Sequence, residues 1–203
     1  MSITLLIIVA TALVSISGFS NRTLFHKLDF SPYQVMQRKE WYRLVSHVLL
    51  HGDWMHLFVN MFVLFSFGNI VERSFPMLFD GRGTFYYLLL YVGGAAFASI
   101  PALKRYGNNP NYTAIGASGA VAAVLFTSII LLPTSKIYVM FIPIGIPAYL
   151  FGPLYIGLEY YLDKRGGGRI AHDAHYWGAL FGLVFPIALK PALFLEFIGQ
   201  IFG

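Results

Sequence analysis

Six stretches of this sequence are apolar and almost free of charged side chains over lengths suited to crossing a bilayer. The hydrocarbon core of a bilayer is about 30 Å thick, and roughly 20 helical residues span it. The stretches are about 3–19, 54–71, 84–103, 116–132, 148–162 and 172–189. Only 11% of the 203 residues are charged, against about 25% in a soluble domain, and the mean hydropathy is +0.66. The sequence therefore predicts an all-α polytopic membrane protein, a six-helix bundle forming one domain over residues 1–203.

The same composition excludes a soluble enzyme, a disordered chain and a nucleic-acid-binding protein. The net charge is +5, but basic residues occur in pairs at most, which suits loops that meet anionic lipid headgroups. There are no cysteines, so disulfides and thiolate chemistry are excluded. The first stretch has no Lys or Arg before its apolar run, which favours a membrane span over a signal peptide. We expect the lipid bilayer as a partner and no nucleic acid.

Two connecting segments are unusual. Residues 20–53 are too many for a turn and too apolar for a solvated loop, and they place Trp and Tyr beside Arg and Lys, as at the headgroup level of a bilayer. Short helices lying in the interface are expected there, and packing on the protein's own rim is a compatible alternative. Residues 140–147 hold too much Pro and Gly for a helix, which predicts an ordered loop leading into the fifth span.

Polar side chains recur near the starts of the even-numbered spans. His56 and Asn60 lie four residues apart in the second span, Ser118 lies near the start of the fourth, and His175 near the start of the sixth. In a serpentine chain these three spans enter from the same side of the membrane. Polar groups are costly in hydrocarbon and commonly mark functional sites. The order of the spans therefore predicts one site formed by all three.

The residue types in this site point to acyl transfer. Ser118 is a potential nucleophile, and His175 is the candidate base that would activate it. Donors for an oxyanion are expected from the second span and from backbone N–H groups at the start of the fourth: His56, Asn60, Gly116 and Ala117. Inside a membrane, hydrolysis of a peptide bond in another membrane protein is the simplest form of this chemistry. No cofactor and no metal is expected.

Several motifs occur in order along the chain, and together they identify a resemblance. They are Glu40-Trp41-Tyr42-Arg43, His47-x3-His51-x4-His56-x3-Asn60, Gly116-Ala117-Ser118-Gly119-Ala120, Ile142-Pro143-Ile144-Gly145-Ile146-Pro147-Ala148 and Ala174-His175-x2-Gly178-x3-Gly182. Over essentially its whole length the chain resembles the rhomboid family of intramembrane serine proteases. The resemblance implies a Ser118–His175 dyad without a third acidic member. It also implies single-span membrane-protein substrates that enter sideways from lipid. Location in a bacterial cytoplasmic membrane, with the site open to the extracytoplasmic face, is the corresponding expectation.

Small residues accompany the candidate dyad. His175, Gly178 and Gly182 share one helical stripe, and the fourth span offers a facing strip of Ser118, Gly119, Ala122 and Ala123. Small residues let membrane helices approach closely. We expect this packing to set the distance between Ser118 and His175.

Each polar residue also has a structural reading. Ser118 could be a helix N-cap, and Asn60 could join two helices by a hydrogen bond. His47, His51 and His56 suggest a metal site, but no HExxH motif is present and no carboxylate joins them, so structural hydrogen bonds are favoured for His47 and His51. Asp173 lies on a different helical face from His175 and is not expected to join the dyad.

Two features depart from the family pattern. Some rhomboids carry an aromatic residue one turn after the nucleophile that stacks on the catalytic histidine, and here that position is Ala122. Phe126, Tyr176 or an aromatic of the second span could hold the His175 ring instead. In addition, ten of the 14 Lys and Arg residues lie in loops on the side of the candidate site, which by the positive-inside rule would be cytoplasmic. We follow the family orientation because half of those ten lie in residues 20–53.

Two other functional classes remain open. A catalytically inactive relative that binds membrane clients would share the fold, although such relatives characteristically lose the serine or the histidine. A small transporter would need paired charges in its spans, and Glu159 is the one acidic candidate.

Overall fold

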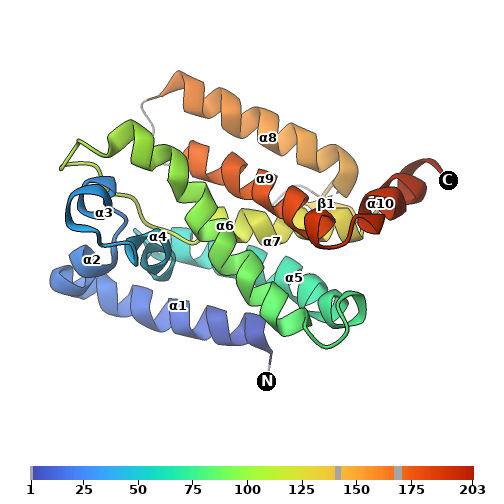
Figure 1. Ribbon diagram of the computed structural model, residues 1–203, viewed down its shortest axis with the longest axis horizontal. Helices are drawn as coiled ribbons and strands as arrows, with labels where there is room; N and C mark the ends of the chain where they lie inside the picture. Colours follow the sequence, from blue (N-terminus) through green and yellow to red (C-terminus); the bar gives the residue numbers. More distant parts are fainter. Residues whose placement is uncertain (1, 140–142, 167–170) are drawn as a thin grey trace.

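The computed structural model describes residues 2–139, 143–166 and 171–203. Its helices and strands, in chain order, are α1 Ile3–Ser20, α2 Arg22–Leu28, α3 Pro32–Arg38, α4 Arg43–Ser46, the 3-10 helix η1 His47–Leu49, α5 Trp54–Leu78, α6 Gly83–Tyr106, α7 Ser118–Leu131, β1 Lys136–Tyr138, β2 Gly145–Pro147, α8 Ala148–Arg165, α9 His172–Leu189 and α10 Ala192–Phe202. The longer helices form a bundle with α1 and α8 on opposite sides and α7 between them (Figure 1). The prediction of an all-α membrane architecture is confirmed.

Each of the six apolar stretches corresponds to one helix, but the helices differ in length. Within the described residues, α1, α5 and α6 are long and apolar enough to cross a membrane, and α9 with α10 makes a fourth span if this pair, bent by 112°, is counted as one. Helix α7 has only 14 residues, about 21 Å of helix, which is shorter than a bilayer core. Six complete crossings therefore stay a prediction.

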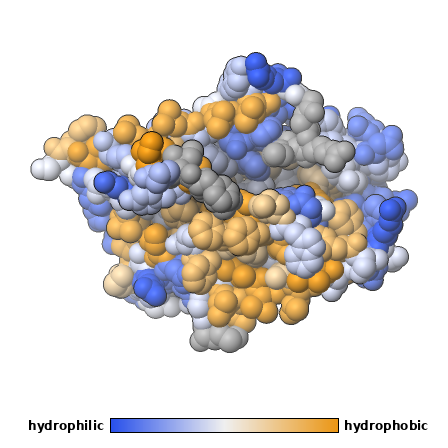
Figure 2. Space-filling model, turned by 180° about the vertical axis from the view of Figure 1, so that it is seen from behind, coloured by the Kyte–Doolittle hydropathy of each residue, from blue (hydrophilic) through white to orange (hydrophobic). Residues whose placement is uncertain are grey.

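Helix α7 forms the centre of the bundle. Every residue from 119 to 130 is buried, and α5, α6, α8, α9 and α10 all contact this helix. On the outside, large apolar side chains are exposed, among them Leu13, Phe58, Phe65, Leu154 and Val184. Figure 2 shows that apolar residues cover much of one face. An apolar surface of this extent suits contact with lipid.

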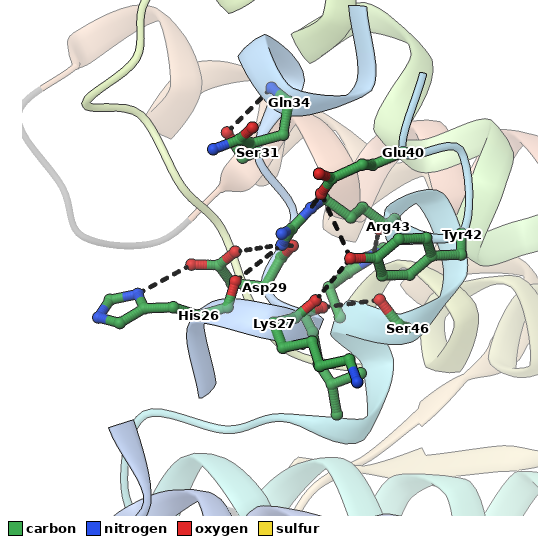
Figure 3. Close-up of polar contacts among 11 residues, drawn as sticks. His26, Lys27, Asp29, Ser31, Gln34, Glu40, Tyr42, Arg43 and Ser46 are labelled. Carbon is green, nitrogen blue, oxygen red and sulfur yellow. Dashed lines mark hydrogen bonds and ion pairs between the residues drawn. The ribbon is translucent and has the colours of Figure 1, made fainter. Parts of the chain in front are cut away.

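The segment 20–53 contains the short helices expected there, and Arg43 ties them together. Its guanidinium is buried and donates through Nη1 to Asp29 Oδ1 at 2.7 Å and to the carbonyl of His26 at 3.0 Å. Its Nε donates to Glu40 Oε2 at 2.6 Å (Figure 3). This hydrogen bond from Arg43 holds the pKa of the Glu40 carboxyl below its usual range. A buried cation paired in this way holds the short helices of this segment against one another.

Helix α5 continues past the point where charge ends the predicted span. Glu72 accepts hydrogen bonds from Ser2 Oγ at 2.7 Å and from the backbone N–H groups of Ile3 at 2.7 Å and Thr4 at 3.0 Å. The first N–H groups of a helix have no partner within it. Glu72 therefore caps the N-terminus of α1. Because its charge is satisfied there, α5 continues beyond Glu72 to Leu78.

The loop predicted over residues 140–147 is partly described. Residues 145–147 form β2, which pairs antiparallel with β1 so that Ile137 faces Ile146. Residues 140–142 lie outside the described residues. Helix α10 was not predicted from the sequence.

Candidate active site

The site begins at the sharp entry to α7. Gly116 has φ +115°, a conformation that L side chains rarely adopt, and a β-carbon there would lie 2.8 Å from the His56 ring. The N–H of Gly116 donates to the carbonyl of His47 at 3.1 Å. Helix α7 therefore starts at Ser118 rather than at the predicted residue 116. Ser118 is half-buried.

The histidines before α5 form a buried layer behind this entry. His51 is 1% exposed, and burial lowers its pKa to about 3, so the ring is neutral. Its Nε2 accepts the N–H of Ala117 at 3.5 Å, so its one proton is on Nδ1 and donates to Ser15 Oγ at 2.9 Å. His47 is also buried, and its Nδ1 lies 2.9 Å from the carbonyl of Arg43. Both rings thus make structural hydrogen bonds, and the N–H of Ala117 is already occupied by His51.

His56 presents a donor toward Gly116. Its Nδ1 accepts the N–H of Gly52 at 3.4 Å, which leaves the proton of a neutral ring on Nε2. A β-carbon on Gly116 would lie 2.8 Å from this Nε2 atom, so the N–H is on the side of the ring that faces Gly116. Asn60 is buried, and its Nδ2 donates one hydrogen to the carbonyl of His56 at 2.9 Å. The second hydrogen on Nδ2 is available to another acceptor.

The backbones of α7 and α9 are in direct contact. A β-carbon on Gly178 would overlap the carbonyl of Gly119, and one on Gly182 would overlap the carbonyl of Ala123. Thr127 Oγ1 adds a hydrogen bond of 2.9 Å to the carbonyl of Gly182. These contacts occur on the stripes that the sequence indicates.

The contact between these helices lies beside the candidate dyad. Gly119 follows Ser118, and the carbonyl of Ala174, which precedes His175, is 3.4 Å from the place of a β-carbon on Gly119. In the described part of the chain no hydrogen bond joins Ser118 Oγ to the His175 ring. Catalytic hydrogen bonds are often long in enzymes without substrate and shorten when it binds.

An acidic group lies next to His175. Glu159, on α8, is 9% exposed, and its Oε2 is 2.6 Å from His172 Nδ1. Its Oε1 is 3.1 Å from His175 Nδ1, off the line of a hydrogen bond, since this nitrogen has no hydrogen-bond partner among the described residues. Sequence reasoning noted Glu159 only as an acid within a span. Its pairing across α8 and α9 depends on tertiary packing that no sequence spacing encodes.

Two of the aromatic residues considered as supports for His175, Phe126 and Tyr176, pack against tyrosines of α8. Phe126 lies 5.5 Å from Tyr155, and Tyr176 lies 6.0 Å from Tyr160, between ring centroids. The ring beside His175 is that of His172, at 6.0 Å. Asp173 accepts the N–H of Ala174 at 2.9 Å.

Comparisons with known proteins show what this chain is similar to. A family model of the Rhomboid domain matches residues 38–192. The chain is similar to RHOMBOID-like protein 12, mitochondrial, of Arabidopsis thaliana, with 31% identity over 151 residues, 67% of this chain and 43% of the relative. It is similar to Rhomboid protease GlpG of Haemophilus influenzae, with 26% identity over 168 residues, 82% of this chain and 78% of the relative. Rhomboid protease GluP of Bacillus subtilis is 36% identical over 86 residues, 42% of this chain and 15% of the relative.

The matched relatives differ from this chain in length and differ from one another in cellular location. The chain spans about half the length or less of the mitochondrial relatives that it matches. Because the relatives are mitochondrial as well as bacterial, they support an integral membrane location without singling out a bacterial membrane.

Proposed function

Because this chain belongs to the rhomboid family, we propose that it is an intramembrane serine endopeptidase with Ser118 as nucleophile and His175 as general base. The observation that carries the proposal is the backbone contact of Gly178 with Gly119. This contact brings α7 and α9 together next to Ser118 and His175. The presence of both Ser118 and His175 favours an active protease over an inactive client-binding relative.

The proposed reaction follows ordinary acyl-transfer steps. His175 Nδ1 faces the Glu159 carboxylate, so Nε2 is the nitrogen that takes the Ser118 proton as Oγ attacks the peptide carbonyl. The same proton then goes to the leaving amine as the C–N bond breaks, and water hydrolyses the acyl-enzyme. The carboxylate of Glu159 stabilises the imidazolium that forms. Glu159 is therefore proposed as an acidic third member beside Ser118 and His175. The resemblance to the rhomboid family alone implies no such member.

Three groups are proposed to stabilise the oxyanion. They are His56 Nε2–H, the second N–H of Asn60 and the backbone N–H groups at the start of α7, which have no partner within the helix. The N–H groups of Gly116 and Ala117 are weaker candidates than the sequence suggests, because the carbonyl of His47 already accepts the first and His51 Nε2 the second.

Substrates and orientation are part of the same proposal. An apolar outer surface around a buried polar site suits single-span membrane proteins that enter from lipid. We propose that the site opens to the extracytoplasmic face, and a bacterial cytoplasmic membrane is the proposed location.

A fluorophosphonate probe tests this function directly. The purified protein in detergent is expected to be labelled, with the adduct on Ser118 by peptide mass spectrometry, because only an activated serine reacts. His175→Ala should abolish the labelling. An unlabelled protein that still binds membrane clients would support the inactive relative instead.

The oxyanion assignment predicts a different pattern. His56→Ala and Asn60→Ala are each expected to lower kcat by on the order of 10²-fold, because each removes one donor that acts in the transition state. Labelling of Ser118 should persist in both variants. Asn69→Ala is the matched control, since this residue is half-buried on the same helix and its Nδ2 also donates to a carbonyl one turn back, that of Phe65. Wild-type rates in both site variants would assign His56 and Asn60 to structure alone.

A further inference from the structure

Glu159, His172 and His175 form a compact set of ligand atoms between α8 and α9. One nitrogen of each histidine and one carboxylate oxygen all lie within 4.8 Å of one another. The two histidines are three residues apart on the first turn of α9, so their side chains leave the helix on one face. The carboxylate reaches them from α8, with one oxygen 2.6 Å from His172 Nδ1 and the other 3.1 Å from His175 Nδ1.

One of these atoms lacks a partner. The carboxylate accepts a hydrogen bond from His172, but His175 Nδ1 is buried and has none within the described residues. A buried polar atom without a partner calls for an explanation such as an ion. Two imidazoles and one carboxylate are a typical ligand set for Zn²⁺, with a fourth position for water.

The spacing needs little change to accept that ion. Zinc bonds of about 2.0–2.1 Å in a tetrahedron place neighbouring ligand atoms about 3.3 Å apart. The 2.6 Å contact with His172 Nδ1 is shorter than this by about 0.7 Å and the 3.1 Å contact with His175 Nδ1 by about 0.2 Å, and rotation of side chains can open both. A neutral imidazole is the form that binds metal.

We propose that Zn²⁺ binds Glu159, His172 and His175 and reversibly inhibits the protease by occupying its general base. The inhibition rests on the proposed function, whereas the binding does not. A neutral imidazole has one N–H and one lone pair. When Nδ1 gives its lone pair to zinc, the proton is held on Nε2, and no lone pair is left there to accept the Ser118 proton.

Zinc titration of the protease activity tests the inhibition. Zinc chloride is expected to abolish cleavage by the wild-type protein, and excess EDTA to restore it. In His172→Asn the amide Nδ2 takes the place of Nδ1 and keeps a donor for Glu159, but it does not bind zinc. Loss of even an outer partner of a metal ligand costs 10–100-fold in affinity, so the half-inhibitory zinc concentration should rise by at least about 10-fold. Each variant is compared with its own zinc-free rate.

His26→Asn is the matched control for that substitution. His26 also has Nδ1 near a carboxylate, 3.4 Å from Asp29 Oδ2, but it is exposed and far along the chain from α8 and α9. This variant should keep wild-type sensitivity to zinc. Equal inhibition of the wild-type and His172→Asn proteins would overturn the site.

A direct measurement of zinc binding tests the metal site separately from the proposed protease function. Calorimetric titration of Ser118→Ala protein with zinc chloride should show one ion per chain, and the His172→Asn and Glu159→Gln changes should each remove that binding. If zinc binds in this way but the wild-type protein never cleaves a membrane substrate, the proposed function fails and the site stands. If the wild-type protein cleaves but no zinc binds, the site is refuted and the protease stands.

Discussion

Replacing Ser118 by Ala is expected to reduce kcat for cleavage of a membrane substrate by on the order of 10⁶-fold, the loss seen when a nucleophile is removed from a serine protease. His175→Ala should cost about as much, since Ser118 without a base is a weak nucleophile. The double variant should be no worse than either single one, because the two groups act as a unit. Single-turnover kinetics in detergent or proteoliposomes measure all three.

Ser128→Ala is the matched control for this prediction. Ser128 lies on the same helix, and its hydroxyl donates to the carbonyl of Leu125 at 2.6 Å. This variant should retain nearly all activity. Substantial cleavage by Ser118→Ala protein that is folded would eliminate the serine-protease mechanism.

Gly178→Leu is expected to disrupt the packing of α7 on α9. Its β-carbon would overlap the carbonyl of Gly119, so the two backbones must separate. Overpacking of a core typically costs 1–3 kcal/mol, and overlap with backbone should cost more than about 3 kcal/mol of unfolding free energy. Fluorophosphonate labelling of Ser118 should also slow at temperatures where the variant is still folded, because the distance to His175 has changed.

Gly157→Leu provides the comparison. Gly157 is exposed on α8, and a β-carbon there would meet nothing within 4 Å. This variant should melt and label like the wild-type protein. A Gly178→Leu protein that melts early but labels Ser118 at the normal rate below its transition would show that the glycine serves stability alone.

Much of the architecture can be predicted from the sequence, because the length of each apolar stretch can be read directly along the chain. The starts of α5 and α9 are predicted to the residue, at Trp54 and His172. The errors arise where tertiary contacts override local rules. Glu72 ends the predicted span, yet its carboxylate caps α1 and the helix runs on to Leu78. Gly116 begins the predicted fourth span, yet its positive φ keeps it outside α7.

The candidate site shows the same division. Positions of polar residues near the starts of three spans are visible in the sequence, and small residues at regular spacing indicate close helix packing. The partner of His175 is not visible in this way. Glu159 is 16 positions away on another helix, and only packing of α8 on α9 brings the carboxylate to the imidazole. An acid within an apolar stretch was the one available signal.

The burial of α7 has a consequence for how the protein responds to its membrane. Residues 119–130 present no side chain to the outside of the bundle, so hydrophobic mismatch does not act on this helix. A thicker or thinner bilayer acts on the outer helices, and it changes their tilt or deforms the lipid around them. The depth of Ser118 is therefore set by the α5, α6 and α9 surfaces that hold α7, rather than by the thickness of the surrounding lipid.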